Sequence, residues 1–120
     1  MSEKEQFIQG SGNVFADLGF EDPEAELARA DLAIQLRNAI KDRGITQAEA
    51  GKILGIDQPK VSLLMRGRTS GFSLERLIAF LNRMGREVQI NIYPTEDGKQ
   101  AGHTSILTHD EALTAAPVKR

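Results

Sequence analysis

Polar and basic side chains at close spacing mark the part of this chain best suited to recognition chemistry. Gln58, Lys60 and Ser62 occur within five positions, and two arginines, Arg66 and Arg68, follow directly. Glutamine and lysine side chains can bind the major-groove edges of adenine and guanine, serine can bind bases or backbone, and arginine binds phosphate. These residue types at this spacing favour nucleic-acid binding.

Residues for catalysis or metal binding are sparse. The chain has no cysteine, which excludes disulfides, thiolate catalysis and cysteine-based zinc fingers. His103 and His109, with Asp110 and Glu111, could ligate a metal in an enzyme. They lie in a polar stretch with no helical or strand pattern to hold them together. We therefore expect no catalytic residues, no metal site and no cofactor.

Four helices are predicted to position the polar residues. Apolar residues recur at helical spacing over 23–43, 47–54, 58–66 and 74–84. Residues that favour the N-cap position precede these segments, and a glycine follows each one. The N-caps are Asp22, Thr46, Asp57 and Ser73, and the glycines are Gly44, Gly55, Gly67 and Gly85.

The second and third helices have the pattern of a helix-turn-helix. Two short helices that cross closely need a position almost free of side chain, which Gly51 supplies, and Gly55 allows the turn between them. Apolar residues at Ala50, Leu54, Ile56, Val61 and Leu64 would hold the pair against the other helices. The second helix of such a motif enters the major groove of DNA. Leu63 and Met65 are expected to pack rather than to contact bases.

After Gly85 the period of the pattern changes from 3.6 to 2. Val88, Ile90 and Ile92 alternate with polar residues up to Pro94, which predicts a β-strand over 87–94. A strand needs a hydrogen-bonding partner. The candidates are residues 13–20 of the same chain and the same strand of a second subunit. If the strand pairs with a second subunit, Val88, Ile90 and Ile92 are the predicted dimerisation residues. A short helix over 110–115 is a further possibility.

Charge is unevenly distributed along the 120 residues. The net charge is −2, but residues 27–86 carry eleven basic and five acidic residues, a net charge of +6. Residues 1–26 carry a net charge of −6, and residues 87–120 a net charge of −2. A basic segment between acidic ends suits a polyanionic partner. No apolar run is long enough to span a membrane, and the N-terminus lacks the pattern of a secretory signal, so we expect a cytoplasmic protein.

Several of these residues carry a resemblance to a known family. The chain resembles the Cro-type (XRE) helix-turn-helix family over residues 27–86, and most closely the small HigA-like antitoxins and transcriptional regulators. The resemblance rests on 46–49, Gly51, 55–56, 58–62 and 66–68, with 13–19 and 72–77 typical of the antitoxin-like members. Gly51 is a departure, because many members carry alanine there.

The resemblance implies a function and a set of site residues. It implies a homodimer that represses transcription from a short palindromic operator on double-stranded DNA and, in antitoxin members, neutralises a toxin ribonuclease. It places Gln47 on a phosphate. The acidic residues 1–26 could then bind a basic toxin. The DNA-binding residues expected from chemistry and resemblance together are Gln47, Gln58, Pro59, Lys60, Ser62, Arg66 and Arg68.

We therefore expect a mainly α fold, a four- to five-helix bundle containing a helix-turn-helix, with one C-terminal β-strand paired across a dimer. The chain divides into an acidic N-terminal arm (1–22), a DNA-binding domain (23–86), a dimerisation strand (87–94) and a polar C-terminal tail (95–120). The alternative is a protein-interaction module whose basic face binds an acidic protein. The scarcity of aromatic anchors disfavours it, because the chain has five Phe, one Tyr and no Trp.

Overall fold

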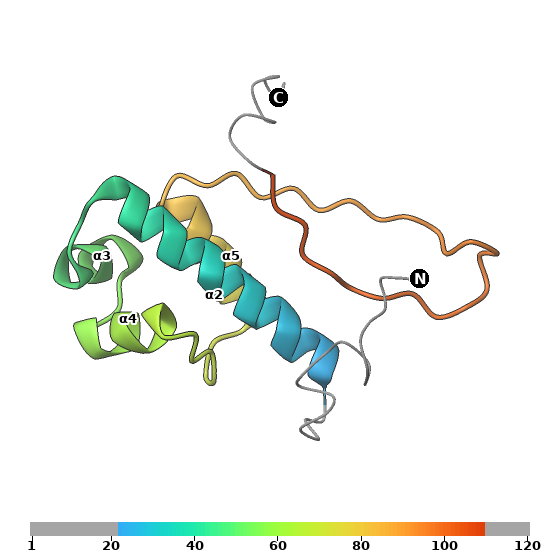
Figure 1. The fold of residues 1–120 in the computed structure, drawn as a ribbon, viewed down its shortest axis with the longest axis horizontal. Helices are drawn as coiled ribbons and strands as arrows, with labels where there is room; N and C mark the ends of the chain where they lie inside the picture. The colour runs from blue at the N-terminus through green and yellow to red at the C-terminus, as the bar shows by residue number, and fades with distance from the viewer. Residues whose placement is uncertain (1–21, 110–120) are drawn as a thin grey trace.

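The computed structural model describes residues 22–109 of the chain. Within this range the chain forms four helices: α2 (Pro23–Arg43), α3 (Gln47–Leu54), α4 (Gln58–Met65) and α5 (Leu74–Arg83). Figure 1 shows α5 lying along α2, with the shorter α3 and α4 grouped at one side of the pair. The predicted helices are confirmed. The strand candidate over 13–20, the possible helix over 110–115 and most of the acidic arm lie outside the described residues.

Each helix begins at a side chain that caps it. The Asp22 carboxylate accepts a hydrogen bond from the Ala25 N–H at 3.3 Å, and Pro23 occupies the first turn of α2. Thr46 and Glu49 form a reciprocal capping box at the start of α3, with distances of 2.8 and 3.1 Å. Ser73 accepts a hydrogen bond from the Arg76 N–H at 3.1 Å. Such caps each stabilise a helix by about 1 kcal/mol, so local sequence fixes where these helices begin.

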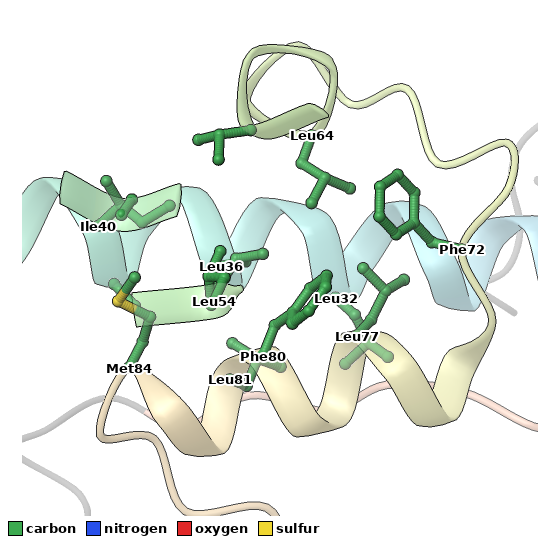
Figure 2. Close-up of a cluster of buried hydrophobic side chains, with 13 residues drawn as sticks. Leu32, Leu36, Ile40, Leu54, Leu64, Phe72, Leu77, Phe80, Leu81 and Met84 are labelled. Carbon is green, nitrogen blue, oxygen red and sulfur yellow. The ribbon is translucent and has the colours of Figure 1, made fainter. Parts of the chain in front are cut away.

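The buried core is formed by apolar side chains from every described helix. Leu36 of α2, Leu54 of α3, Leu64 of α4 and Leu77 of α5 are each at most 2 % exposed. Figure 2 shows these side chains pointing toward one another between α2, α4 and α5, with Phe72 entering from the loop before α5. Because α3 and α4 share this core with the two longer helices, the core fixes the position of the helix-turn-helix.

The predicted strand over 87–94 is not present in this chain. Residues 86–95 are extended, but no part of the described chain forms a strand. After a turn near Gly98, residues 101–109 run back in the opposite direction (Figure 1) without pairing with 87–94. The alternating apolar pattern predicted a β-strand, and the described residues do not bear that prediction out. Strand pairing needs a backbone partner, which the single chain does not supply within its described residues.

The described residues contain no helix that is both long and apolar enough to cross a lipid bilayer. In the longest helix, α2, Leu32, Leu36 and Ile40 face the shared core, whereas Ile34 is exposed.

Candidate nucleic-acid interface

Close approach of α3 and α4 depends on Gly51. A Cβ atom built at this position would lie 2.6 Å from the backbone oxygen of Ile56, in the turn between the two helices. The Gly51 carbonyl also accepts hydrogen bonds from the N–H groups of Gly55 (2.7 Å) and Ile56 (3.0 Å). Gly55 has a φ of +79°, a left-handed conformation that glycine adopts without strain. Both glycines therefore have the roles that the sequence predicted.

A side chain from α5 fixes the end of α3. The Nη1 atom of Arg83 donates a hydrogen bond to the backbone oxygen of Leu54 at 2.7 Å. This carbonyl belongs to the last turn of α3, where carbonyl groups lack partners within the helix. The positive charge also suits the negative end of the helix dipole. α3 is thus attached to α5 by a polar contact as well as by the core.

The start of α3 presents backbone donors beside Gln47. Within the described residues, the N–H groups of Gln47 and Ala48 have no hydrogen-bond partner, whereas those of Thr46 and Glu49 belong to the capping box. The Gln47 side chain is half-buried. Free N–H groups at a helix N-terminus are well placed to bind a phosphate. The Thr46 N–H also holds the pKa of the nearby Glu49 carboxyl below its usual value, so Glu49 is ionised at neutral pH.

The beginning of α4 is exposed and polar. Val61 and Leu64 are buried, which turns the opposite side of the helix outward. Gln58, Pro59 and Lys60 are all exposed in the first turn. Asp57 caps the helix by accepting a hydrogen bond from the Lys60 N–H at 3.2 Å. The Lys60 ammonium group makes no ion pair within the described residues and is free to meet an anion.

Farther along α4, Ser62 and Leu63 are half-buried. Met65 packs against the buried core, as expected, but Leu63 is not among the described side chains that pack on it. Leu63 lies one turn after Pro59 on the same side of the helix, because residues four apart share a face. The helical period could have identified this apolar pair, since Val61 and Leu64 already mark the buried side. Leu63 is therefore an additional candidate site residue, beside those predicted from the sequence.

Arg66 and Arg68 lie exposed just after α4. The Arg68 N–H bonds the Leu63 oxygen at 2.9 Å, and Gly67 has a φ of +79°, so the backbone here turns in a defined way. Neither arginine forms an ion pair with another described residue. Both guanidinium groups are therefore available to a phosphate.

The loop that follows is tied back to α5. Phe72 is buried and meets Phe80 edge to face, with 6.0 Å between ring centroids. The Arg76 guanidinium lies over both rings, 5.1 Å from the centroid of Phe72 and 5.4 Å from that of Phe80. A cation over an aromatic face contributes about 0.5–1 kcal/mol at an exposed site. This contact holds the loop between the candidate interface and α5 in place.

The predicted DNA-binding residues lie on two helices of the structure. Gln47 begins α3, and the others lie on α4 or directly after it, at Gln58, Pro59, Lys60, Ser62, Arg66 and Arg68. The predicted dimerisation residues lie on the extended segment after α5. Val88 is half-buried against the core, whereas Ile90 is 74 % exposed and Ile92 is 90 % exposed.

The histidines considered for a metal site have a different environment. The Nδ1 atom of His103 lies 2.9 Å from a carboxylate oxygen of Glu24 at the start of α2. Within residues 22–109, no group of three or more His, Asp or Glu side chains is arranged to hold a metal ion. Asp110 and Glu111 lie outside the described residues.

Comparison with known proteins gives a consistent result. A family model described as a helix-turn-helix domain matches residues 14–93. A solved structure named "Putative XRE Family Transcriptional Regulator" is similar, with a TM-score of 0.67 and 35 % sequence identity, covering 73 % of this chain and 99 % of that chain. No curated protein matches the chain. Both the family model and the solved structure include the helix-turn-helix.

Proposed function

The chain belongs to the XRE-type helix-turn-helix family of DNA-binding transcriptional regulators, and on this premise we propose that it is a repressor acting as a homodimer on a short palindromic operator. The observation that carries the proposal is the exposed first turn of α4. Gln58 and Lys60 extend there from a helix held in place by Val61 and Leu64. In a helix-turn-helix, residues at this position meet the edges of bases in the major groove.

Each candidate side chain has a proposed role on DNA. Gln58 binds adenine through its amide, Lys60 binds guanine or the backbone, and Ser62 binds either class of group. Gln47 and the free N–H groups at the start of α3 bind a phosphate. Arg66 and Arg68, which follow the C-terminal end of α4, bind phosphates of the DNA backbone. Sequence-specific binding requires both contacts to base edges and contacts to phosphates.

Pro59 and Leu63 complete the surface with apolar contacts. They lie one turn apart on the outward side of α4, and Leu63 is not part of the described core. The major groove offers one apolar group, the 5-methyl of thymine. We assign these two residues to thymine contacts.

The homodimer is proposed because the surface of one recognition helix is small. One recognition helix covers only a few base pairs, and two half-sites about 34 Å apart give usable affinity and a palindrome. Val88, Ile90 and Ile92 are the proposed dimerisation residues. The high exposure of Ile90 and Ile92 supports this assignment, because exposed aliphatic side chains gain stability when a partner covers them.

The first experiment selects a binding site from random duplex DNA and measures affinity as salt rises. We expect one preferred sequence with two-fold symmetry and a steep loss of affinity, because phosphate contacts release counterions. Lys60→Ala should weaken binding to the selected site about tenfold or more. Lys99→Ala, which removes the same charge from the turn before residues 101–109, serves as the control. If no sequence is enriched and an acidic protein binds instead, the interaction-module alternative is correct.

An antitoxin role is a second proposal, favoured by the net charge of −6 on residues 1–26. An acidic segment would attract a basic toxin ribonuclease. The test co-expresses the protein with any small basic ribonuclease encoded by the neighbouring gene. If deleting residues 1–20 abolishes protection of the cells from the ribonuclease but keeps DNA binding, the antitoxin role is supported. If the cells stay protected after the deletion, residues 1–20 have no part in neutralising the toxin.

A further inference from the structure

Two extended segments of the chain enclose a groove. The first segment is defined as residues 87–94 and the second as residues 101–109, and Figure 1 shows them running in opposite directions. Both segments line one open groove, whose floor is formed by side chains of α2 and α5 that include Leu32, Leu74 and Ile78. Its volume of about 1630 Å³ exceeds the roughly 300–1,000 Å³ of a small-molecule site. The groove therefore suits a length of polypeptide.

The two segments line the same groove without pairing with each other. No backbone hydrogen bond joins residues 88–94 to residues 101–109. Antiparallel neighbours of one chain would normally pair directly, since unpaired backbone groups favour a partner. Here residues 88–94 and residues 101–109 lie on either side of the groove without backbone hydrogen bonds to each other, which leaves room for a strand between them. The Thr104 N–H of the second segment is bonded instead to the Glu24 carboxylate.

Local contacts hold the segments in this arrangement. In the turn between them, Asp97 accepts hydrogen bonds from the N–H groups of Lys99 (2.9 Å) and Gln100 (3.1 Å). Val88 of the first segment and Ile106 of the second pack against the core. His103 of the second segment meets Glu24 of α2. The groove is thus bounded on both sides by anchored chain.

The segments expose apolar surface suited to a protein interface. Ile90, Ile92, Tyr93 and Leu107 are each 74–90 % exposed. At roughly 60–120 Å² for each aliphatic side chain and about 200 Å² for tyrosine, they expose on the order of 400 Å² per chain. Two copies would therefore bury on the order of 800 Å² at these side chains alone, and the half-buried floor residues Leu74 and Ile78 would add to this area. The total approaches the lower end of specific interfaces, about 1,200 Å².

We propose that a second copy of this chain occupies the groove with its own first segment, and that the exchange is mutual. The first segment carries the alternating apolar pattern of a strand, and Val88 shows that its apolar side faces the helices. Ile90 and Ile92 continue that side beyond the core of their own chain. In the partner's groove they meet the floor formed by Leu74 and Ile78.

The exchange produces a four-stranded sheet. The two first segments pair antiparallel at its centre across the two-fold axis, and each second segment pairs on the outside with the partner's first segment. This gives residues 101–109 a structural role in the dimer. The inference rests on the homodimer of the proposed function and specifies how that dimer is built.

Proline substitutions in the second segment provide the test. Proline removes one backbone N–H and is compatible with extended chain. Backbone N–H groups of successive strand residues point to opposite edges, so Ser105→Pro and Thr108→Pro affect opposite edges of the second segment. We expect one of them to raise the dimer dissociation constant at least tenfold in sedimentation equilibrium, while the other changes it less than threefold. Each variant acts as the control for the other.

Two results would overturn the inference. If Ile90→Lys separates the dimer and neither proline variant weakens it, the first segments pair only with each other, along their outer edges. If the full-length protein stays monomeric at all concentrations, no exchange occurs. Binding of the selected DNA is measured on the same samples. Loss of DNA recognition in a protein that still dimerises, with the proline pattern intact, would count against the proposed function alone.

Discussion

On the outward side of α4, two kinds of side chain lie close together at the scale of single residues. Gln58 and Lys60 carry hydrogen-bonding or charged groups, whereas Pro59 and Leu63 are apolar. Hydrogen bonds at base edges distinguish adenine and guanine, and apolar contact distinguishes thymine by its methyl group. Specificity on this surface is therefore expected to depend on both kinds of contact.

The proposed thymine contact gives a prediction for Leu63. Leu63→Ala should weaken binding to the selected site by about 1 kcal/mol, since one buried methyl or methylene group is worth about 0.8 kcal/mol. Replacing the contacted thymine with uracil removes only the methyl group and should weaken wild-type binding by a similar amount. The two changes together should cost no more than either alone. Leu63→Met, which keeps an apolar side chain, is the matched control, and additive losses in a fluorescence-anisotropy titration would exclude the contact.

Gly51 gives a second prediction at this scale. Alanine is the better helix former by about 1 kcal/mol, but its Cβ would lie 2.6 Å from the Ile56 oxygen. Backbone cannot yield as a flexible side chain does, so Gly51→Ala should destabilise the fold by about 1–3 kcal/mol. Urea unfolding followed by circular dichroism measures the change. Ala48→Gly, at an exposed position of the same helix, reports the propensity effect by itself. An increase in stability for Gly51→Ala would show that the turn can widen.

At the scale of helices, the position of the helix-turn-helix depends on how α3 is attached. The core supplies most of the attachment, through Leu54 and Ala50, which are both buried. The bond from Arg83 to the Leu54 oxygen adds a directional contact between α3 and α5. A carbonyl left without this donor would be partly buried and unsatisfied, which is costly.

Two arginines near the end of α5 allow this contact to be tested. Arg83→Ala should lower the free energy of unfolding by about 1.5–3 kcal/mol, the range for a hydrogen bond to a charged group. Arg86→Ala removes an exposed ion pair with Asp42 at 2.7 Å and should cost no more than about 1 kcal/mol. Thermal unfolding of both variants gives the comparison. If both variants lose the same free energy of unfolding, the Arg83 hydrogen bond stabilises the fold no more than an exposed ion pair does.

Two features belong to the scale of the whole molecule: the distribution of charge along the chain and the attachment of the second extended segment to α2. The basic helical region of residues 27–86 has a net charge of +6 and lies between acidic ends, so the net charge of −2 is an average over segments of opposite sign. The second segment is joined to the start of α2 through Glu24. Hydrogen bonds from the Thr104 N–H and from His103 lower the pKa of the Glu24 carboxyl below its ordinary value of 4.5. The joining contact therefore depends on the ionised form of Glu24 and hence on pH.

The direction of this pH dependence follows from the lowered pKa. The carboxylate accepts the Thr104 N–H while ionised, so the attachment is present above the ordinary pKa and is lost as pH falls through the lowered one. Glu24→Gln at pH 7 should weaken the attachment in the same way. Hydrogen exchange at the Thr104 amide should then become several-fold faster. Glu49→Gln, at a carboxyl whose pKa is lowered within the α3 capping box, should leave that amide unchanged. Unchanged exchange in Glu24→Gln would mean that other contacts hold the second segment.

The sequence by itself determined the four helices, their caps and the exposed polar turn of α4. These features depend on interactions between residues close in the chain, such as the contact of Thr46 with Glu49 or the left-handed turn at Gly55. The same local patterns identified Gln58 and Lys60 as candidate DNA-binding residues before any tertiary contact was known.

Only the tertiary structure decided the features that depend on distant residues. The contact of Arg83 with Leu54 and that of His103 with Glu24 join positions 29 and 79 residues apart. The sequence predicted a strand over 87–94 and assigned residues 101–109 to a polar tail. A periodic pattern specifies an extended backbone, but pairing requires a second backbone at hydrogen-bonding distance. In this chain no backbone hydrogen bond joins residues 88–94 to residues 101–109 across the groove, because Val88 and Ile106 pack on the core and the Thr104 N–H bonds Glu24.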